Sequence, residues 1–172
     1  MPILSGSLQN VYQSLDVYLT ANLLFSDGSP ISIRLHGIRR FIPPQTLPWV
    51  EAHYDFLGLN DTFMNRVGMT GAGVPRIATQ REGYLQLNCF QRARSFTTRY
   101  TTSMMRDLVV GQFPDGELID IHDYSTDPPG QDGWIVVDGV KDHVVDTGLH
   151  SGVIQHVVQI ATRYLEIATR SV

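Results

Sequence analysis

Aspartate and histidine residues, which can hold a divalent metal ion in an enzyme, are concentrated in one stretch of this sequence. Apolar and polar residues alternate over residues 118–124, which predicts a strand with Asp120 and His122 on its solvent-exposed face. Together with His143 they could form a metal site, so a metal-dependent hydrolase is one hypothesis. The whole set comprises Asp120, His122, Asp123, Asp127, Asp132, Asp138, Asp142, His143, Asp146 and His150.

The spacing of these residues matches no recognised metal-ligand motif, and the glycines and prolines around them favour turns, in which aspartate is common. The sequence also lacks a nucleophile elbow, a Walker loop, an HExxH helix and paired cysteine motifs. We therefore interpret the stretch as a solvated acidic surface and expect no catalytic residue, metal or cofactor. The single cysteine, Cys89, is expected to be a small buried apolar residue.

A strand and a helix near the middle of the chain form the unit around which the rest is expected to pack. Alternation over residues 84–90 places Leu85, Leu87 and Cys89 on one face of a strand. After a short polar break, Ser95 is a candidate N-cap for an amphipathic helix. The predicted apolar stripe of this helix is Phe96, Tyr100, Met104 and Leu108, and its predicted polar side is Thr98, Thr102, Arg106 and Gln112.

The other elements are predicted along a single domain, 1–172. A helix is expected over 7–24, and strands over 31–35, 50–57, 118–124, 134–137, 140–148 and 152–167. The last segment also fits a helix, but its valine, isoleucine and threonine content favours a strand. Residues 58–79 show no regular period and are predicted as a long hairpin loop. These elements predict an α+β fold, with a mixed or antiparallel sheet and two helices on one face.

Charge and composition narrow the classes of partner. The formal net charge of −4 and the pI near 5.8 argue against broad affinity for nucleic acids or anionic membranes. No run of about 18 apolar residues indicates a membrane span, and the first residues do not resemble a secretory signal, so a reducing cytosol is expected. Arginines concentrate in the first two thirds of the chain and acidic residues in the last third, a pattern that could support head-to-tail contacts between copies. Trp49, Tyr84 and Phe90 are candidate interface anchors if they lie outside the core.

Several segments together resemble the tail terminator, or tail completion, proteins of long-tailed bacteriophages. They are the N-terminal helix, the strand WVEAHYDF preceded by prolines, the long loop, REGYLQLNCFQRA running into a helix, and the final strand GVIQHVVQIATRYLEI. Residues 81–90 match the central strand of the family, which has an arginine, small residues, a glycine and then alternating apolar positions that end in phenylalanine. The resemblance covers about residues 7–113 and the last strand. Residues 114–150 are longer and more acidic than it implies and are interpreted as an insertion.

The resemblance implies a structural virion protein that is not an enzyme and that assembles as a hexameric ring. Such a ring caps a tube of major tail tube protein, ends its polymerisation and joins it to a head-side connector, or stopper, protein. DNA passes through the lumen without specific binding, and no membrane is involved. The protein is then made in the host cytoplasm and resides in the virion, at the head-tail junction.

Another head-tail connector or tube module of the same machinery is the alternative within this class. The residues expected at protein interfaces are Arg39, Arg40, Trp49, Asn65, Arg66, Met69, Arg76 and Arg94.

Overall fold

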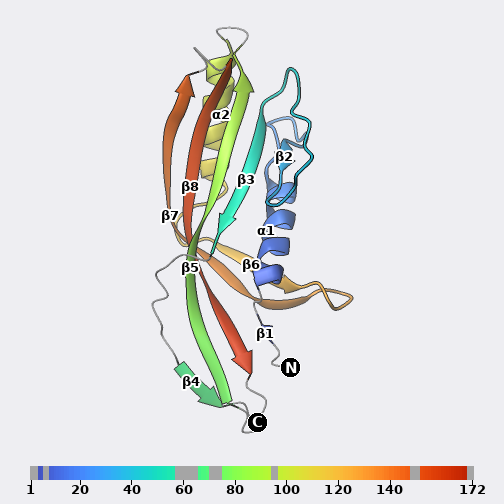
Figure 1. Cartoon of the computed structure of the whole chain (residues 1–172), viewed down its shortest axis with the longest axis vertical. Helices are drawn as coiled ribbons and strands as arrows, with labels where there is room; N and C mark the ends of the chain where they lie inside the picture. Colours follow the sequence, from blue (N-terminus) through green and yellow to red (C-terminus); the bar gives the residue numbers. More distant parts are fainter. Residues whose placement is uncertain are drawn as a thin grey trace.

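The computed structural model describes residues 4–5, 8–56, 66–69, 75–93, 97–147 and 152–169. Within these ranges, two helices pack against one sheet of eight strands, which confirms the predicted α+β fold. The helices are α1 (Leu8–Asn22) and α2 (Thr97–Gly111). The strands are β1 (Leu4–Ser5), β2 (Ser32–Arg34), β3 (Trp49–Asp55), β4 (Arg66–Met69), β5 (Pro75–Arg92), β6 (Leu118–Asp123), β7 (Gly130–Thr147) and β8 (Val153–Thr169) (Figure 1).

The sheet follows the order β2-β3-β5-β8-β7-β6, with β4 added to β5 and β1 added to β8. Only β2 and β3 pair in parallel among the described strands, so the sheet is mixed, as predicted. Its longest pairing joins β5 to β8, from Arg76↔Thr169 to Arg92↔Val153. The last segment of the chain is therefore a strand, and the helix alternative is wrong.

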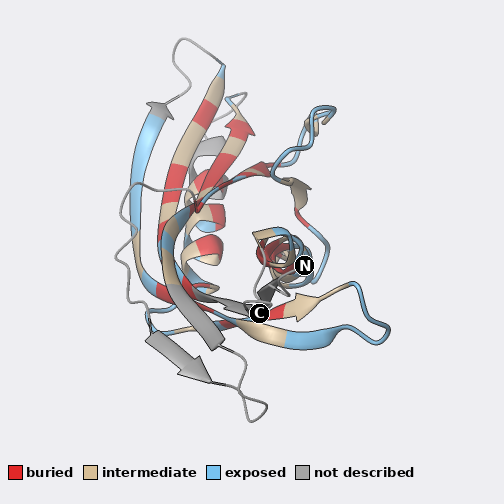
Figure 2. Ribbon diagram, turned by 60° about the horizontal axis from the view of Figure 1, so that its bottom comes forward, coloured by how far each residue is buried: buried red, intermediate tan, exposed pale blue. Residues whose placement is uncertain are grey.

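The hydrophobic core lies on the concave face of the curled sheet, where both helices sit (Figure 2). Val11, Leu15 and Leu19 follow each other at steps of four along α1 and are fully buried. Leu85 and Leu87 of β5, predicted to face the core, belong to the same buried cluster. Each such side chain contributes about 1.5–3 kcal/mol by its burial, so this contact fixes α1 within the curl of the sheet.

The buried side of α2 differs from the predicted one. Met104, predicted on the apolar stripe, is 61% exposed, whereas Thr102, predicted on the polar side, is fully buried. Thr102 Oγ1 donates a 3.1 Å hydrogen bond to Gln91 Oε1 on β5, so a satisfied polar pair occupies the helix–sheet contact. A pattern of apolar residues cannot reveal such a pair. The buried positions at the end of α2 are Met105, Val109 and then Phe113.

Two segments are more regular than the sequence predicts. Residues 58–79 were expected to be a loop, but β4 and the start of β5 lie within them and pair from Arg66↔Ala78 to Met69↔Pro75. β7 is one strand of 18 residues where two short strands were predicted. A β-bulge between Val137 and Gly139 lets β7 continue between the two predicted strands. Gly139 there adopts a φ of 148°, which favours glycine. The predicted cap Ser95 and the first stripe residue, Phe96, lie outside the described residues.

One part of the sheet extends beyond the helices. It consists of β1, β4, residues 75–80 of β5 and residues 165–169 of β8, and we call it the arm (Figure 1). The arm is made by strand pairing alone, so its backbone is continuous with the central strands of the body. The predicted interface residues Arg66 and Met69 belong to β4, and Arg76 belongs to the start of β5.

Candidate functional site

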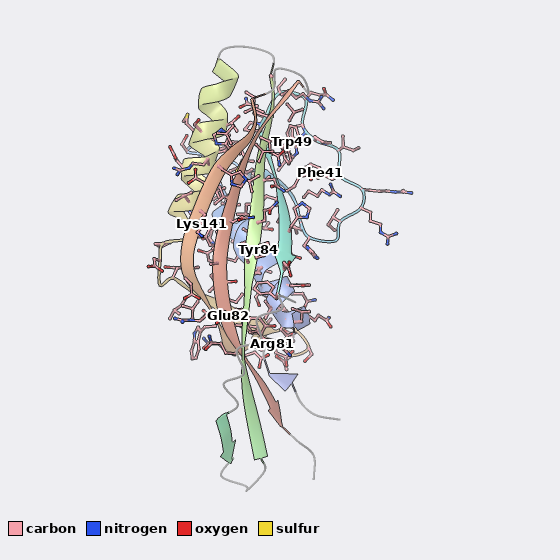
Figure 3. The ribbon with its side chains drawn as sticks, turned by 60° about the vertical axis from the view of Figure 1, so that its left-hand side comes forward. Phe41, Trp49, Arg81, Glu82, Tyr84 and Lys141 are labelled. Carbon is pink, nitrogen blue, oxygen red and sulfur yellow. The ribbon has the colours of Figure 1, made fainter. Side chains whose placement is uncertain are left out.

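The convex face of the sheet is turned away from both helices and is polar at its centre. Gln86 Nε2 donates a 3.0 Å hydrogen bond to Asn88 Oδ1, and Gln159 Nε2 donates a 3.2 Å bond to Gln86 Oε1. Tyr84, two residues before Gln86 on β5, is exposed (Figure 3), and a hydrogen bond to Asp55 raises the pKa of its phenol. Asn88 is buried, whereas Gln86 and Gln159 are partly exposed. Uncharged amides carry both donors and acceptors, so these two glutamines are suited to contact with another protein surface.

Trp49, a predicted interface residue, is only 5% exposed in this chain. Its ring stacks on Phe90 with centroids 5.4 Å apart, and its Nε1 donates a 3.3 Å hydrogen bond to Glu51 Oε1. Glu51 in turn pairs with Arg34 at 3.0 Å. Trp49 therefore packs within the subunit. Of the three aromatic residues considered as anchors, Trp49 is buried, Phe90 is half-buried and Tyr84 is exposed.

Residues 36–48 connect β2 to β3, and we call them the basic loop. They include Arg39 and Arg40 and no acidic residue, and both arginines are exposed. Ile42 is 89% exposed, and Ile38 and Leu47 are also exposed. A segment that presents apolar side chains next to cations is typical of a surface that binds a protein partner.

The basic loop is held in place at several points. Arg34 Nε donates a 2.9 Å hydrogen bond to the carbonyl of Ile38, and Arg92 Nε donates a 3.5 Å bond to that of Pro44. The backbone N–H of Tyr54 donates a 3.0 Å bond to His36 Nδ1, and the two rings stack. These contacts pre-order the loop, which lowers the entropy cost of binding through it.

Residues 115–138 form a second charged element at the other end of the sheet, and we call it the acidic hairpin. It contains β6, a turn and the first half of β7, and it carries seven carboxylates with no lysine or arginine. It is fastened to α1, because the backbone N–H of His122 donates a 2.9 Å hydrogen bond to Ser14 Oγ and Asn10 Nδ2 donates a 3.0 Å bond to Asp132 Oδ2. The predicted acidic surface is thus a fixed part of the fold.

A cavity of about 570 Å³ opens where the acidic hairpin leaves the sheet. β7 pairs with β8 only as far as Ile135↔Tyr164, while β8 continues into the arm. Beyond this pair the acidic hairpin and the arm run in different directions, and the cavity lies between them. The cavity is lined by Gln80, Leu118, Gln131, Asp132, Gly133, Trp134, Val136, Arg163 and Tyr164.

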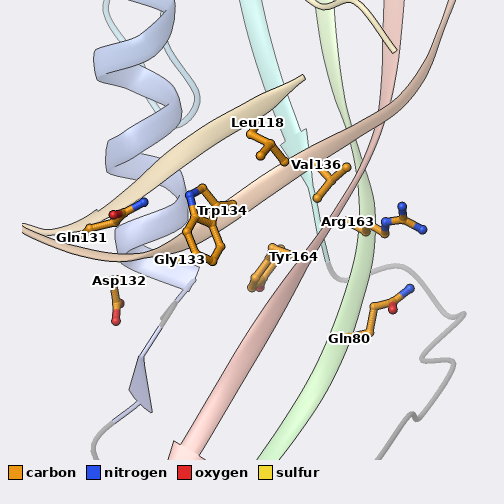
Figure 4. Close-up of a pocket in the computed structure, with 9 residues that line it drawn as sticks. All are labelled: Gln80, Leu118, Gln131, Asp132, Gly133, Trp134, Val136, Arg163 and Tyr164. Atoms are coloured by element: carbon orange, nitrogen blue, oxygen red, sulfur yellow. The ribbon is translucent and has the colours of Figure 1, made fainter. Parts of the chain in front are cut away.

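The middle of this cavity is apolar and its two sides are polar. Figure 4 shows Trp134, Val136 and Tyr164 between Gln131 and Asp132 on one side and Gln80 and Arg163 on the other. Two of the lining side chains lie in solvent to an unusual extent, since Trp134 is 53% exposed and Leu118 is 56% exposed. Sequence reasoning missed this site, because the cavity follows from the divergence of two strands. The one available signal was a tryptophan inside an acidic segment.

The residues predicted at interfaces do not form one site. Arg39 and Arg40 lie on the basic loop, whereas Arg66, Met69 and Arg76 belong to strands of the arm. The last two of the predicted set, Asn65 and Arg94, lie outside the described residues.

The residues of the metal-site hypothesis are separated by the fold. Asp120 and His122 pair with Trp134 and Gln131 at the start of β7, whereas His143 lies near its end. His143 follows Trp134 by nine residue steps along the strand, a distance of about 30 Å at about 3.3 Å per step. Within the described ranges, no group of three or more histidine, cysteine, aspartate or glutamate residues is arranged to hold a metal ion. The three-residue site therefore does not assemble.

No protein-family model matches this chain, and no curated protein matches it. Neither of the described helices has the length and apolar composition that a membrane span requires.

Proposed function

We propose that this protein is a structural virion protein that forms a ring on the end of a phage tail tube. The ring ends tube polymerisation and provides the surface to which the head-side connector joins. The single observation that carries the proposal is the arm, an extension of β4, β5 and β8 beyond the helix-packed body (Figure 1). A projecting ribbon of strands adds surface without adding core, as expected of a protein whose task is to hold neighbours.

The order of elements supports the same proposal. An N-terminal helix, the strand WVEAHYDF, the central strand REGYLQLNCFQR, an amphipathic helix and a long last strand occur in this order in the fold. A fold by itself does not define a function, so the proposal rests on these segments together with the arm and the exposed surfaces described above.

The charge of the chain is compatible with DNA passing through such a ring. The formal net charge of the chain is −4. Like charges repel, so DNA would not adhere to the lumen and would move through it freely.

Polymerisation of the matching tail tube protein tests this proposal. Tubes are assembled with and without the purified protein, and their lengths are measured in negative-stain images. We expect added protein to shorten the tubes at amounts far below one copy per tube subunit, because one ring blocks one growing end. Density attached to only one end of each tube is also expected.

The proposal is wrong if the tubes keep the same length distribution and show no added density at either end. The matched control is Met104→Asp, which changes an exposed apolar residue on α2, a helix that packs on β5 and β8. This variant should cap tubes as the unchanged protein does.

A further inference from the structure

We propose that the ring is closed by insertion of the basic loop of one copy into the cavity beside the acidic hairpin of the next copy. The inference rests on the proposed function and adds the contact by which the copies assemble. Three observations carry it: the position of the two elements in the sheet, their matching apolar surfaces and their opposite charges.

The two elements lie at opposite edges of the strand order, and the curl of the sheet places both edges beside α1 (Figure 2). The basic loop connects β2 to β3, the first two strands of the sheet order, and the acidic hairpin is formed by β7 and β6, the last two. No residue of the basic loop lines the cavity of its own chain, and α1 lies between the two elements (Figure 2). A contact between unlike surfaces is heterologous, and a heterologous contact repeats into a closed ring when the rotation is suitable.

The apolar surfaces match in kind and in size. Ile42 is 89% exposed in the basic loop, and Leu118 and Trp134, which line the cavity, are also exposed. A volume of about 570 Å³ falls within the range of about 300–1,000 Å³ typical of ligand cavities and exceeds one isoleucine side chain. Insertion of Ile42 would remove all three side chains from water at once.

The charges around these apolar residues favour the same partner. Arg39 and Arg40 precede Ile42 in a loop without acidic residues. Asp120 and Asp132 lie on the hairpin side of the cavity, and the one arginine that lines it, Arg163, pairs with Asp138 of the hairpin at 3.3 Å. Opposite charges attract the two surfaces and disfavour loop-to-loop or hairpin-to-hairpin contacts. A second copy of this chain supplies both features, so it is the occupant that we infer.

A mixing experiment with two variants tests this contact. Ile42→Asp damages the loop and leaves the cavity intact, whereas Leu118→Asp damages the cavity and leaves the loop intact. Both side chains are largely exposed, so the variants should fold, and circular dichroism with thermal unfolding checks this. Each variant alone should associate at least about 30-fold more weakly than the unchanged chain, because an apolar contact is lost and a carboxylate takes its place.

Mixed in equal amounts, the two variants should form a complex of two chains and stop there. The intact cavity of the Ile42→Asp copy accepts the intact loop of the Leu118→Asp copy, and the other ends of both chains are blocked. Analytical ultracentrifugation distinguishes the single chain, the two-chain complex and the full assembly. Met104→Asp is the matched control and should assemble fully.

Each contrary result has its own meaning. If Ile42→Asp assembles like the unchanged chain, or if the mixture gives no complex, the proposed contact is wrong while a ring held by other surfaces stands. If the unchanged chain does not associate even at high concentration, both the contact and the ring fail. If the mixture gives the two-chain complex but the unchanged protein does not cap tubes, the contact is correct and the proposed function is wrong.

Discussion

Replacement of Gly83 by alanine should destabilise the protein, because β5 passes very close to the end of β3 at this residue. A Cβ atom at Gly83 would lie 2.7 Å from Phe56 Cδ1 and 2.8 Å from Phe56 Cα, and it would also run into the carbonyl oxygen of Asp55. Two of these three atoms belong to the backbone and cannot rotate away. The Phe56 ring is itself buried and packs edge-on against Tyr164, so it has little room to move.

Two opposing effects set the change in the free energy of unfolding caused by Gly83→Ala. Inserting a methyl group into a packed interior costs about 1–3 kcal/mol, and the backbone contacts place Gly83→Ala at the upper end of that range. Replacing glycine with alanine also reduces the conformational entropy of the unfolded chain, which stabilises the folded protein by about 0.4–1 kcal/mol. The expected net loss is therefore about 2 kcal/mol, which corresponds to a Tm lower by about 4–8 °C for a chain of this size.

Urea unfolding followed by tryptophan fluorescence, with thermal unfolding in parallel, measures this loss. Gly111→Ala is the control, because a Cβ at Gly111 meets no atom within 4 Å and the residue ends α2. That variant should be as stable as the unchanged protein or more stable by up to about 1 kcal/mol. A Gly83→Ala protein as stable as the Gly111→Ala protein would refute the close approach of the two strands.

Two further predictions concern ionisable groups. Arg106 donates hydrogen bonds of 2.8 and 2.7 Å to the two carboxylate oxygens of Asp142, and these bonds hold the pKa of Asp142 below its usual 3.8. The pair therefore stabilises the fold above about pH 4, and that stability is lost as the pH falls through the lowered pKa. Asp142→Asn should cost about 0.5–1 kcal/mol at pH 7, since both side chains are about one-third exposed, and an undiminished cost at acidic pH would contradict the assignment. Burial raises the pKa of Cys89 to about 12, so a thiol reagent at pH 8 should label it only as fast as the protein unfolds, and rapid labelling of the folded protein would show that the β5 face is open.

Periodicity predicted the elements whose burial is apolar and regular. Leu85, Leu87 and Cys89 alternate on β5, and Val11 and Leu15 recur on α1, because each of these elements has one apolar face against the core. The predicted buried side of α2 is wrong by one residue position. The helix contacts β5 through Thr102 and Gln91, and a polar pair leaves no signal in a pattern of apolar residues. The arm was missed for a related reason, since residues 66–79 include glycine, proline and threonine without a period.

Of the two surfaces in the proposed contact, the sequence indicated the basic loop but not the cavity. Arg39 and Arg40 stand out as charges in a segment that prolines exclude from a central strand. The cavity beside Trp134 depends on where β7 stops pairing with β8, and that register is set by contacts between strands far apart in the chain. The separation of His143 from Asp120 depends on the pairing of β6 with β7, which sets Asp120 opposite Trp134.

The central claim is that this chain works as a closed collar of identical subunits on a tube end. Averaged end-on images of tubes assembled with the protein test it most directly. Six copies arranged around an open channel, joined each to the next by one repeated contact between unlike surfaces, are the predicted result. Tube ends that carry no ring, or a subunit that sits there as a single copy, would contradict it.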